Sequence, residues 1–200
     1  MKKKIVTLCA ALALCATAII GGTLAYFTDT KTAENTFAVG KVAITLDEAQ
    51  VNEMGEKVDE TRVTGNEYKL IPGHTYKKDP TIHVANDSEK SYLFVKVENG
   101  IKAYETTDET KTIAAQMKAN DWELLDGVDN VYYLEGTDGK PAVVSAGAEK
   151  IIFGNFIIDG DVTEIKAEDA KPITITAYAV QADGFADKSA SEIWTAANLA

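Results

Sequence analysis

Cysteine is nearly absent from this chain of 200 residues: only Cys9 and Cys15 occur, both within one apolar stretch near the N-terminus. No disulfide can form beyond residue 15, so packing or assembly must stabilise the fold. Histidine is also scarce, since His74 and His83 are the only two and the sequence has no His-Glu-x-x-His motif. Because a zinc site needs three or four converging ligands, we expect a structural or surface role for each histidine.

Other motifs of catalysis are missing too. The chain has no later cysteine to act as a thiol nucleophile, no Gly-x-Ser-x-Gly motif and no glycine-rich phosphate-binding loop. These absences predict no catalytic residue and no cofactor. Two groups of turn residues are candidate calcium ligands: Asp159, Asp161 and Glu164, and Asp126, Asp129 and Asn130. Because neither spacing matches an EF-hand loop, we expect ordinary solvated turns and no metal site.

Basic residues are outnumbered by acidic ones. The 20 Lys and Arg against 31 Asp and Glu give a net charge of −11. Such a charge repels nucleic acid and anionic membrane surfaces, so we expect no nucleic-acid partner. Solubility is the simplest role for this charge, and the alternatives are binding of divalent cations and spacing of subunits along a polymer.

The first 25 residues are typical of a secretory signal peptide. Lys2–Lys4 form a positive region, residues 5–20 are apolar, and Thr23 and Ala25 are the small residues that a signal peptidase requires. This pattern predicts cleavage after Ala25, so that the exported protein begins at Tyr26. Cleavage removes three lysines and no acidic residue, which changes the net charge from −11 to −14.

A retained membrane anchor is the alternative reading of this stretch. No charge appears between Ile5 and Phe27, and an apolar run of that length can span a bilayer. Gly21-Gly22 favours cleavage, since paired glycines weaken a helix where a signal peptidase needs extended chain. We therefore expect a secreted protein without a stable membrane anchor after cleavage.

In the rest of the chain apolar and polar residues alternate with a period of two, which predicts β-strands with one buried face. The clearest examples are residues 42–46, 93–97 and 173–179. Further predicted strands cover residues 68–71, 76–85, 130–135, 142–145 and 150–158. The phase of the alternation flips at Gly40, which predicts a β-bulge between residues 37–39 and the first core strand.

Two capping boxes predict short helices. Thr106 with Glu109 precedes one apolar group, and Ser189 with Glu192 precedes another that contains Trp194. We expect Trp194 to anchor the last helix on the sheets. Many short strands, turn residues between them and few helices predict an all-β fold, an antiparallel β-sandwich with one or two short helices.

Two segments near the N-terminus resemble a known family. Residues 21–29 (GGTLAYFTD) and 36–42 (TFAVGKV) are similar to the start of the TasA/camelysin family of secreted surface proteins, whose signal peptides are cut by a SipW-type peptidase. The similarity is weaker at residues 70–73 (LIPG) and 175–185 (ITAYAVQADGF), and residues 99–150 show no family pattern. The resemblance implies a sandwich of jelly-roll type.

The resemblance also implies a role for the exported N-terminus. TasA-like proteins build extracellular matrix fibres by donating this segment as a strand, so residues 26–40 are expected to form a donor arm and residues 41–200 the sandwich. The residues expected to act in assembly are Tyr26, Phe27, Phe37, Val39 and Gly40. A disordered or self-docked arm is the alternative.

These observations lead to one main hypothesis and one alternative from a different class, with an adhesion module for a specific ligand as a third possibility. The main hypothesis is a secreted structural protein of a biofilm matrix or cell surface, whose partners are copies of itself, a SipW-type signal peptidase and an accessory matrix protein. The alternative, which the family resemblance also carries, is a secreted metallo-endopeptidase of the camelysin type. The two hypotheses predict different behaviour of the purified protein, which either polymerises without cutting casein or cuts it in a chelator-sensitive way.

Overall fold

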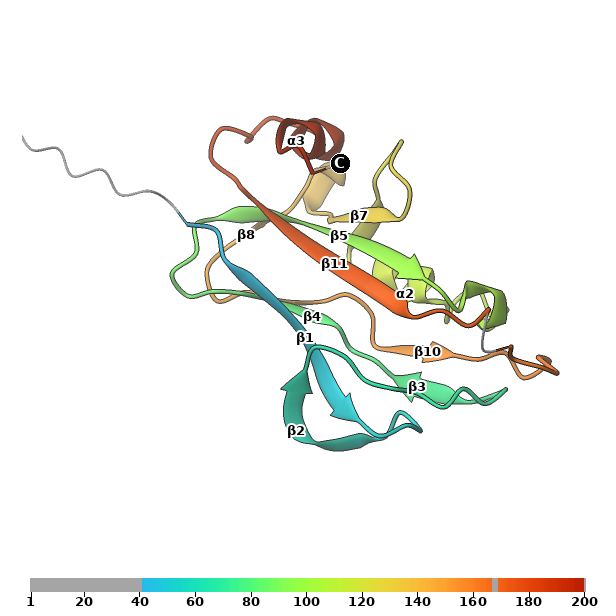
Figure 1. Cartoon of the computed structure of the whole chain (residues 1–200). Helices are drawn as coiled ribbons and strands as arrows, with labels where there is room; N and C mark the ends of the chain where they lie inside the picture. Colours follow the sequence, from blue (N-terminus) through green and yellow to red (C-terminus); the bar gives the residue numbers. More distant parts are fainter. Residues whose placement is uncertain (1–40, 167–168, 200) are drawn as a thin grey trace, which may run out of the picture. The chain divides into compact units, whose positions relative to one another are not determined.

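The computed structural model describes residues 41–166 and 169–199 (Figure 1). The residues predicted for cleavage and assembly lie outside this part: Thr23, Ala25, Tyr26, Phe27, Phe37, Val39 and Gly40. The β-bulge expected at Gly40 lies outside it for the same reason. In the part that is described, no helix is long and apolar enough to cross a membrane.

The first sheet has the strand order β2-β1-β4-β9, and all neighbours are antiparallel. Its strands are β1 (Ile44–Val51), β2 (Lys57–Val63), β4 (Thr81–Val84) and β9 (Glu149–Ile151). A two-stranded extension pairs β3 (Thr75–Lys77) with β10 (Asn155–Ile157), also antiparallel. The chain passes from β3 to β4 and from β9 to β10 with only three residues between them, so the extension continues the same layer.

The second sheet has the order β11-β5-β7-β6, again antiparallel. Its strands are β5 (Ser91–Asn99), β6 (Trp122–Leu124), β7 (Val131–Leu134) and β11 (Ile173–Gln181), and β8 (Val143–Val144) pairs with the start of β5. β5 and β11 form the longest ladder, from Ser91 opposite Gln181 to Asn99 opposite Ile173. Because β5 is buried on both faces, it is the central strand of the molecule.

The main core lies between the two sheets. Buried Ile82 and Val84 of β4 share one apolar cluster with Leu93, Val95 and Val97 of β5. A second cluster covers the opposite face of β5, where Tyr92 and Phe94 pack with residues of the last helix. The predicted all-β antiparallel sandwich with short helices is therefore confirmed.

Two α-helices occur in the described residues, α2 (Ile113–Ala119) and α3 (Ala190–Ala196), together with the 3-10 turns η1 (Lys102–Tyr104) and η2 (Thr137–Gly139). The capping box predicted for α3 is confirmed: Glu192 N donates to Ser189 Oγ at 3.3 Å and Ser189 N donates to Glu192 Oε2 at 2.9 Å. The capping box predicted at Thr106 is wrong. α2 begins after Thr112, whose hydroxyl accepts a hydrogen bond from Ala115 N at 3.1 Å, while Thr106 belongs to a preceding turn.

Several strand boundaries also differ from the prediction. Residues 76–85 and 150–158 are each interrupted, at residues 78–80 and 152–154. The two segments nevertheless stay opposite each other in one register, since Lys78 N donates to Gly154 O at 3.2 Å and Ile152 N donates to Pro80 O at 2.8 Å. The strand predicted at residues 68–71 is wrong, because its backbone bonds outside any ladder: Lys69 N donates to Glu53 O at 2.8 Å and Ile71 N donates to the Tyr76 hydroxyl at 2.7 Å. β2 and β6 were not predicted.

Candidate functional site

Four strands lie at the ends of the two larger sheets, and they differ in how open they are to another strand. β9 and β6 have only three residues each, and β2 carries Lys57, Asp59, Glu60 and Arg62 among its seven. β11 has nine residues, ITITAYAVQ, and none is charged. Long uncharged edge strands are the ones to which an added strand can pair, whereas charges and shortness protect an edge.

Alternate residues of β11 direct their backbone N–H and C=O groups to the outer edge of the sheet. Ala182 N donates to Lys90 O at 2.8 Å and Gly100 N donates to Pro172 O at 3.2 Å, so the even-numbered residues face β5. The odd-numbered residues face the opposite side: Ile173, Ile175, Ala177, Ala179 and Gln181. Within the described part of the chain no strand pairs with that side, so these backbone groups are available to an incoming strand.

The side chains of the same odd-numbered residues belong to the main core but are only partly covered. Ile173, Ile175, Ala177 and Ala179 are all half-buried against it. On the first sheet, Ile44 and Leu46 of β1 are half-buried against the same cluster. In Figure 1, β1 and β11 lie across from each other at this margin of the sandwich. The core is therefore incompletely closed along β11.

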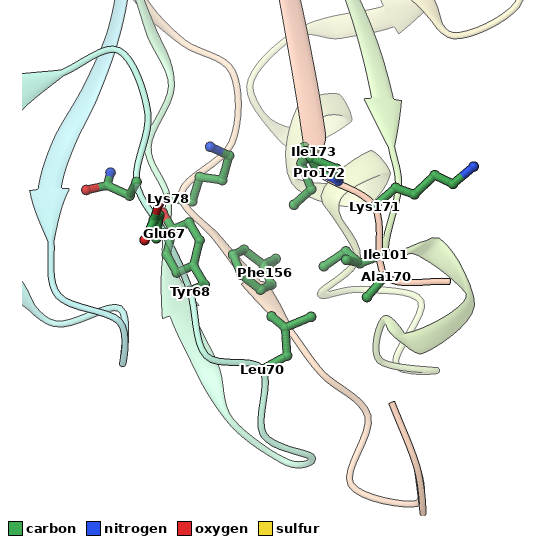
Figure 2. Close-up of a pocket in the computed structure, with 11 residues that line it drawn as sticks. Glu67, Tyr68, Leu70, Lys78, Ile101, Phe156, Ala170, Lys171, Pro172 and Ile173 are labelled. Atoms are coloured by element: carbon green, nitrogen blue, oxygen red, sulfur yellow. The ribbon is translucent and has the colours of Figure 1, made fainter. Parts of the chain in front are cut away.

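Two adjoining hollows lie beside Ile173 on the core-facing side of β11. The larger has a volume of about 430 Å³, and Figure 2 shows Tyr68, Lys78 and Phe156 on one side of it and Ile101 and Ile173 on the other. The smaller, of about 70 Å³, is lined by Leu46, Glu48, Lys78, Ile173 and Ile175. Because the two share Lys78 and Ile173, they form one depression, and we call this depression together with the outer edge of β11 the β11 groove.

A buried ion pair forms the polar part of the groove wall. Lys78 Nζ donates to Glu48 Oε2 at 2.5 Å, and Asn66 Nδ2 donates to Glu48 Oε1 at 2.9 Å. Lys78 is 9% exposed and Glu48 3% exposed. Burial, together with the Glu48 carboxylate, raises the pKa of Tyr68, whose hydroxyl donates to Lys77 O at 3.1 Å. A buried ion pair adds little net stability, but loss of one partner leaves an uncompensated buried charge. Glu48 and Lys78 are therefore held together in the groove wall.

The other face of β11 is covered by α3. The Trp194 ring lies 5.2 Å from Tyr178 of β11 and 5.4 Å from Phe94 of β5, measured between ring centroids. Trp194 is 5% exposed, and Ile193 beside it is fully buried. The predicted anchoring role of Trp194 is confirmed. The helix thus holds β11 on β5 while the outer edge of β11 stays open.

Neither histidine lines this groove, although His83 hydrogen-bonds Asp47, which lines the smaller hollow. His74 Nε2 hydrogen-bonds Met54 O at 2.8 Å, and its ring packs against Tyr76 with 4.5 Å between centroids. His83 lies on the outer face of the first sheet between two carboxylates, with Nε2 2.9 Å from Asp47 Oδ1 and Nδ1 3.1 Å from Glu149 Oε1. Sequence reasoning missed these carboxylate partners, because Asp47, His83 and Glu149 meet only through strand pairing.

Arg62 also binds this group through Asp47. Burial raises the pKa of Asp47, but the hydrogen bonds from Arg62 and His83 outweigh this effect, so its pKa is lowered. Asp47 is therefore already engaged by two donors. Among the residues that the structure describes, no group of three or more His, Cys, Asp or Glu side chains could hold a metal ion.

The turn carboxylates considered for calcium have ordinary local partners. Asp159 accepts hydrogen bonds from Asp161 N at 2.9 Å and from Thr107 N at 2.8 Å, and these bonds lower its pKa. The structure therefore assigns Asp159 to holding two loops together. Neither this turn nor the one at residues 126–130 belongs to a metal-binding cluster in the described part.

The fold and the groove define an all-β sandwich with an open edge along β11, and one family of known proteins matches part of the chain. The model of the camelysin metallo-endopeptidase family matches residues 1–70, a stretch that ends after β2. The resemblance to the TasA/camelysin family is thus confirmed over this part of the chain. No curated protein matches the chain, and no solved structure matches it.

Proposed function

We propose that this chain is a secreted structural protein that forms extracellular-matrix or cell-surface fibres, in which residues 26–39 of one copy add as a strand to the β11 groove of the next. The observation that carries the proposal is β11 itself, a nine-residue edge strand without charge beside a half-covered core. Main-chain hydrogen bonds to such an edge supply affinity, and pockets for alternate side chains supply specificity.

The sequence of the arm fits this groove. Phe37 and Val39 are apolar and two residues apart, so in an extended strand both side chains point to the same face. Opposite the groove they cover Ile173 and Ile175, which are half-buried in the described structure. Each apolar side chain that becomes fully buried contributes roughly 1.5–3 kcal/mol before the entropy of ordering is counted.

Secretion is part of the same proposal. The arm becomes a free N-terminus only when the predicted signal peptide is removed after Ala25, by a peptidase that the family resemblance suggests is of the SipW type. Mass spectrometry of the exported protein should give a first residue of Tyr26. A secreted species that retains Cys9 and Cys15 contradicts this part of the proposal.

The decisive experiment removes the arm from the exported protein. Deletion of Tyr26–Asn35 should leave a folded, soluble monomer that does not polymerise, since β1 begins only at Ile44. The double substitution Phe37→Asp/Val39→Asp should have the same effect, because it places charges where apolar contact is required. A matched control is Val58→Asp/Thr61→Asp on the exposed strand β2, which adds the same charge and should polymerise normally.

The competing function is a metallo-endopeptidase, which the name of the matching family favours. The same preparations distinguish it. A protease should cut casein in a chelator-sensitive manner with or without the arm, and His74→Ala or His83→Ala should abolish cleavage. Light scattering and a casein assay on each variant give the result: fibres that persist without the arm, or cleavage lost with a histidine, overturn the structural proposal.

A further inference from the structure

We infer that the donated strand runs antiparallel to β11, with Val39 opposite Ile173 and Phe37 opposite Ile175, an orientation opposite to that of an arm folded back on its own subunit. This inference rests on the proposed function and deepens it. It follows from where the described chain begins, from the direction of β1 and from the position of the larger hollow.

The described chain begins at the end of the β11 groove marked by Gln181. Glu89 N donates to Lys41 O at 2.9 Å, and the next residue, Lys90, accepts a hydrogen bond from Ala182 N at 2.8 Å. Lys41 and Ala182 are therefore close neighbours. The point at which the arm joins the described chain therefore lies at this end of the groove.

The opposite end of the groove is the one that holds the larger hollow. From Lys41 the chain enters β1, which runs across the groove until Leu46 and Glu48 line the smaller hollow together with Ile173 and Ile175. β1 and β11 thus run in opposite directions, as Figure 1 shows. The larger hollow lies beyond, between Leu70, Ile101 and Ile173 (Figure 2).

If every subunit adds to a fibre in the same direction, the orientation of the donated strand is fixed. Each subunit sends its own arm out at the Gln181 end, so the body of the preceding subunit must lie at the Ile173 end. Residues 39–40, at the C-terminal end of the arm, join the arm to the body of its own subunit. The donated strand therefore has Val39 near Ile173 and its N-terminus toward Gln181, which makes it antiparallel to β11.

An arm docked on its own subunit has the reverse direction. It must turn back near Gly40 beside Lys41, so Val39 lies near Gln181 and the strand runs parallel to β11. Phe37 then faces the small side chains of Ala177 and Ala179, far from the hollow beside Tyr68 and Leu70. The donated arrangement places Phe37 and Val39 at the hollows and forms an antiparallel ladder, the slightly more stable of the two kinds.

The alternation of β11 restricts the register. Directly opposed residues in an antiparallel pair have side chains on the same face, so Phe37 and Val39 face the core only opposite odd-numbered residues. With Val39 opposite Ile173 and Phe37 opposite Ile175, Ala38 lies opposite Thr174. Thr174 directs its backbone toward β5, so this is a non-hydrogen-bonded pair, with Cα atoms about 4.5 Å apart. That distance lies within the range for a disulfide.

Engineered cysteines test the orientation in the secreted protein, which contains no cysteine after the predicted cleavage. In fibres of Ala38→Cys/Thr174→Cys, oxidation or a short bis-maleimide should join subunits into covalent ladders on a denaturing gel. The matched variant Ala38→Cys/Val180→Cys tests the reverse direction, since Val180 lies near the other end of β11 and, like Thr174, is even-numbered, so its side chain is on the same face of the sheet as that of Ala38. We expect at least tenfold more ladder from the first variant.

Other outcomes of this experiment overturn one proposal or the other. Cross-linked monomers of the Val180 variant show a self-docked arm, and ladders of this variant in fibres show the reverse polarity; both results overturn the inference. The second of these results leaves strand donation intact. Failure of the unmodified protein to form any fibre overturns the proposed function itself.

A second variant pair tests the hollow. Leu70→Glu places a charge at a half-buried position that lines it, whereas Ile71→Glu places the same charge on the adjacent residue, which is 36% exposed. Seeded elongation should slow at least tenfold for Leu70→Glu and less than twofold for Ile71→Glu, with unchanged circular dichroism. Equal elongation rates in a folded Leu70→Glu protein contradict the placement of Phe37 and Val39 at this end.

Discussion

The strands β2 and β11 are both sheet edges, but only one of them is protected. β2 carries charged residues at four of its seven positions, and one of them, Arg62, binds Asp47 of β1. β11 has no charge, is two residues longer and is backed by α3 on one face. Charges on an edge strand oppose pairing with another chain. The contrast favours the exposed edge of β11, over that of β2, as the place where the proposed strand pairs.

The largest effect that we expect concerns the groove wall beside β11. Lys78→Met should lower the free energy of unfolding by about 3–5 kcal/mol, because Glu48 is left buried without its partner. The double variant Glu48→Leu/Lys78→Met should recover most of this loss, since apolar residues can replace a buried pair. Urea unfolding measures both. A single variant as stable as the unmodified protein would show that Glu48 has water or another partner.

Two separate proline substitutions on β11 test which of its backbone N–H groups are unpaired. Thr176→Pro removes an N–H that faces β5 and should cost about 3 kcal/mol or more of stability. Ala177→Pro removes an N–H that faces the outer edge, so it should cost far less, yet prevent fibre growth. Thermal unfolding and light scattering give the two readouts. Equal destabilisation by both prolines would contradict the assignment of odd-numbered residues to the free edge.

Acidification tests how β2 is held. The pKa of Asp47 is lowered in the folded state, so its contribution is present above the unfolded value of 3.8 and is lost as the pH falls through the lowered pKa. Stability should therefore drop below about pH 4, and Asp47→Asn should reduce this drop. Urea midpoints between pH 6 and pH 2 measure it. If the stability of Asp47→Asn falls with pH as steeply as that of the unmodified protein, the bonds from Arg62 and His83 to Asp47 contribute no stability.

The smallest effect on stability, and the most direct test of the comparison, is removal of the charges from β2. Lys57→Thr/Asp59→Thr/Glu60→Thr should change the free energy of unfolding by about 0.5 kcal/mol or less at each exposed site. It should, however, leave Arg62 as the one charged residue of β2 and cause lateral association of fibres, visible by electron microscopy. Fibres of unchanged width would show that charge is not what protects β2.

Sequence patterns predicted the strands that have one buried face. β1, β5 and β11 all contain the predicted alternating segments, and α3 has the predicted capping box, because periodicity and capping are local properties. β2 was not predicted, since a strand exposed on almost every residue has no apolar alternation to detect. Residues 68–71 have strand-like side chains but bond through Tyr76 and Glu53, which no local pattern indicates.

The sequence predicted some of the strands that form the groove, but not the groove itself. The sequence identified β11 as a strand, but which strand lies at an edge is decided by pairing between distant segments. The Glu48–Lys78 pair joins residues 30 positions apart and gave no sequence signal other than charged residues inside or beside predicted strands. The arm that we propose as the occupant came from the family resemblance and from the apolar residues Phe37 and Val39.

The long ladder between β11 and β5 also has a mechanical consequence. Its antiparallel pairs run without interruption from Ile173 to Gln181, and α3 fastens the same strand through Trp194. A pull along the axis of β11 loads all of these hydrogen bonds together in shear, whereas a pull across it breaks them one after another. A strand added to the outer edge shares this geometry. A fibre built on β11 should therefore resist stretching along the strand direction far better than peeling.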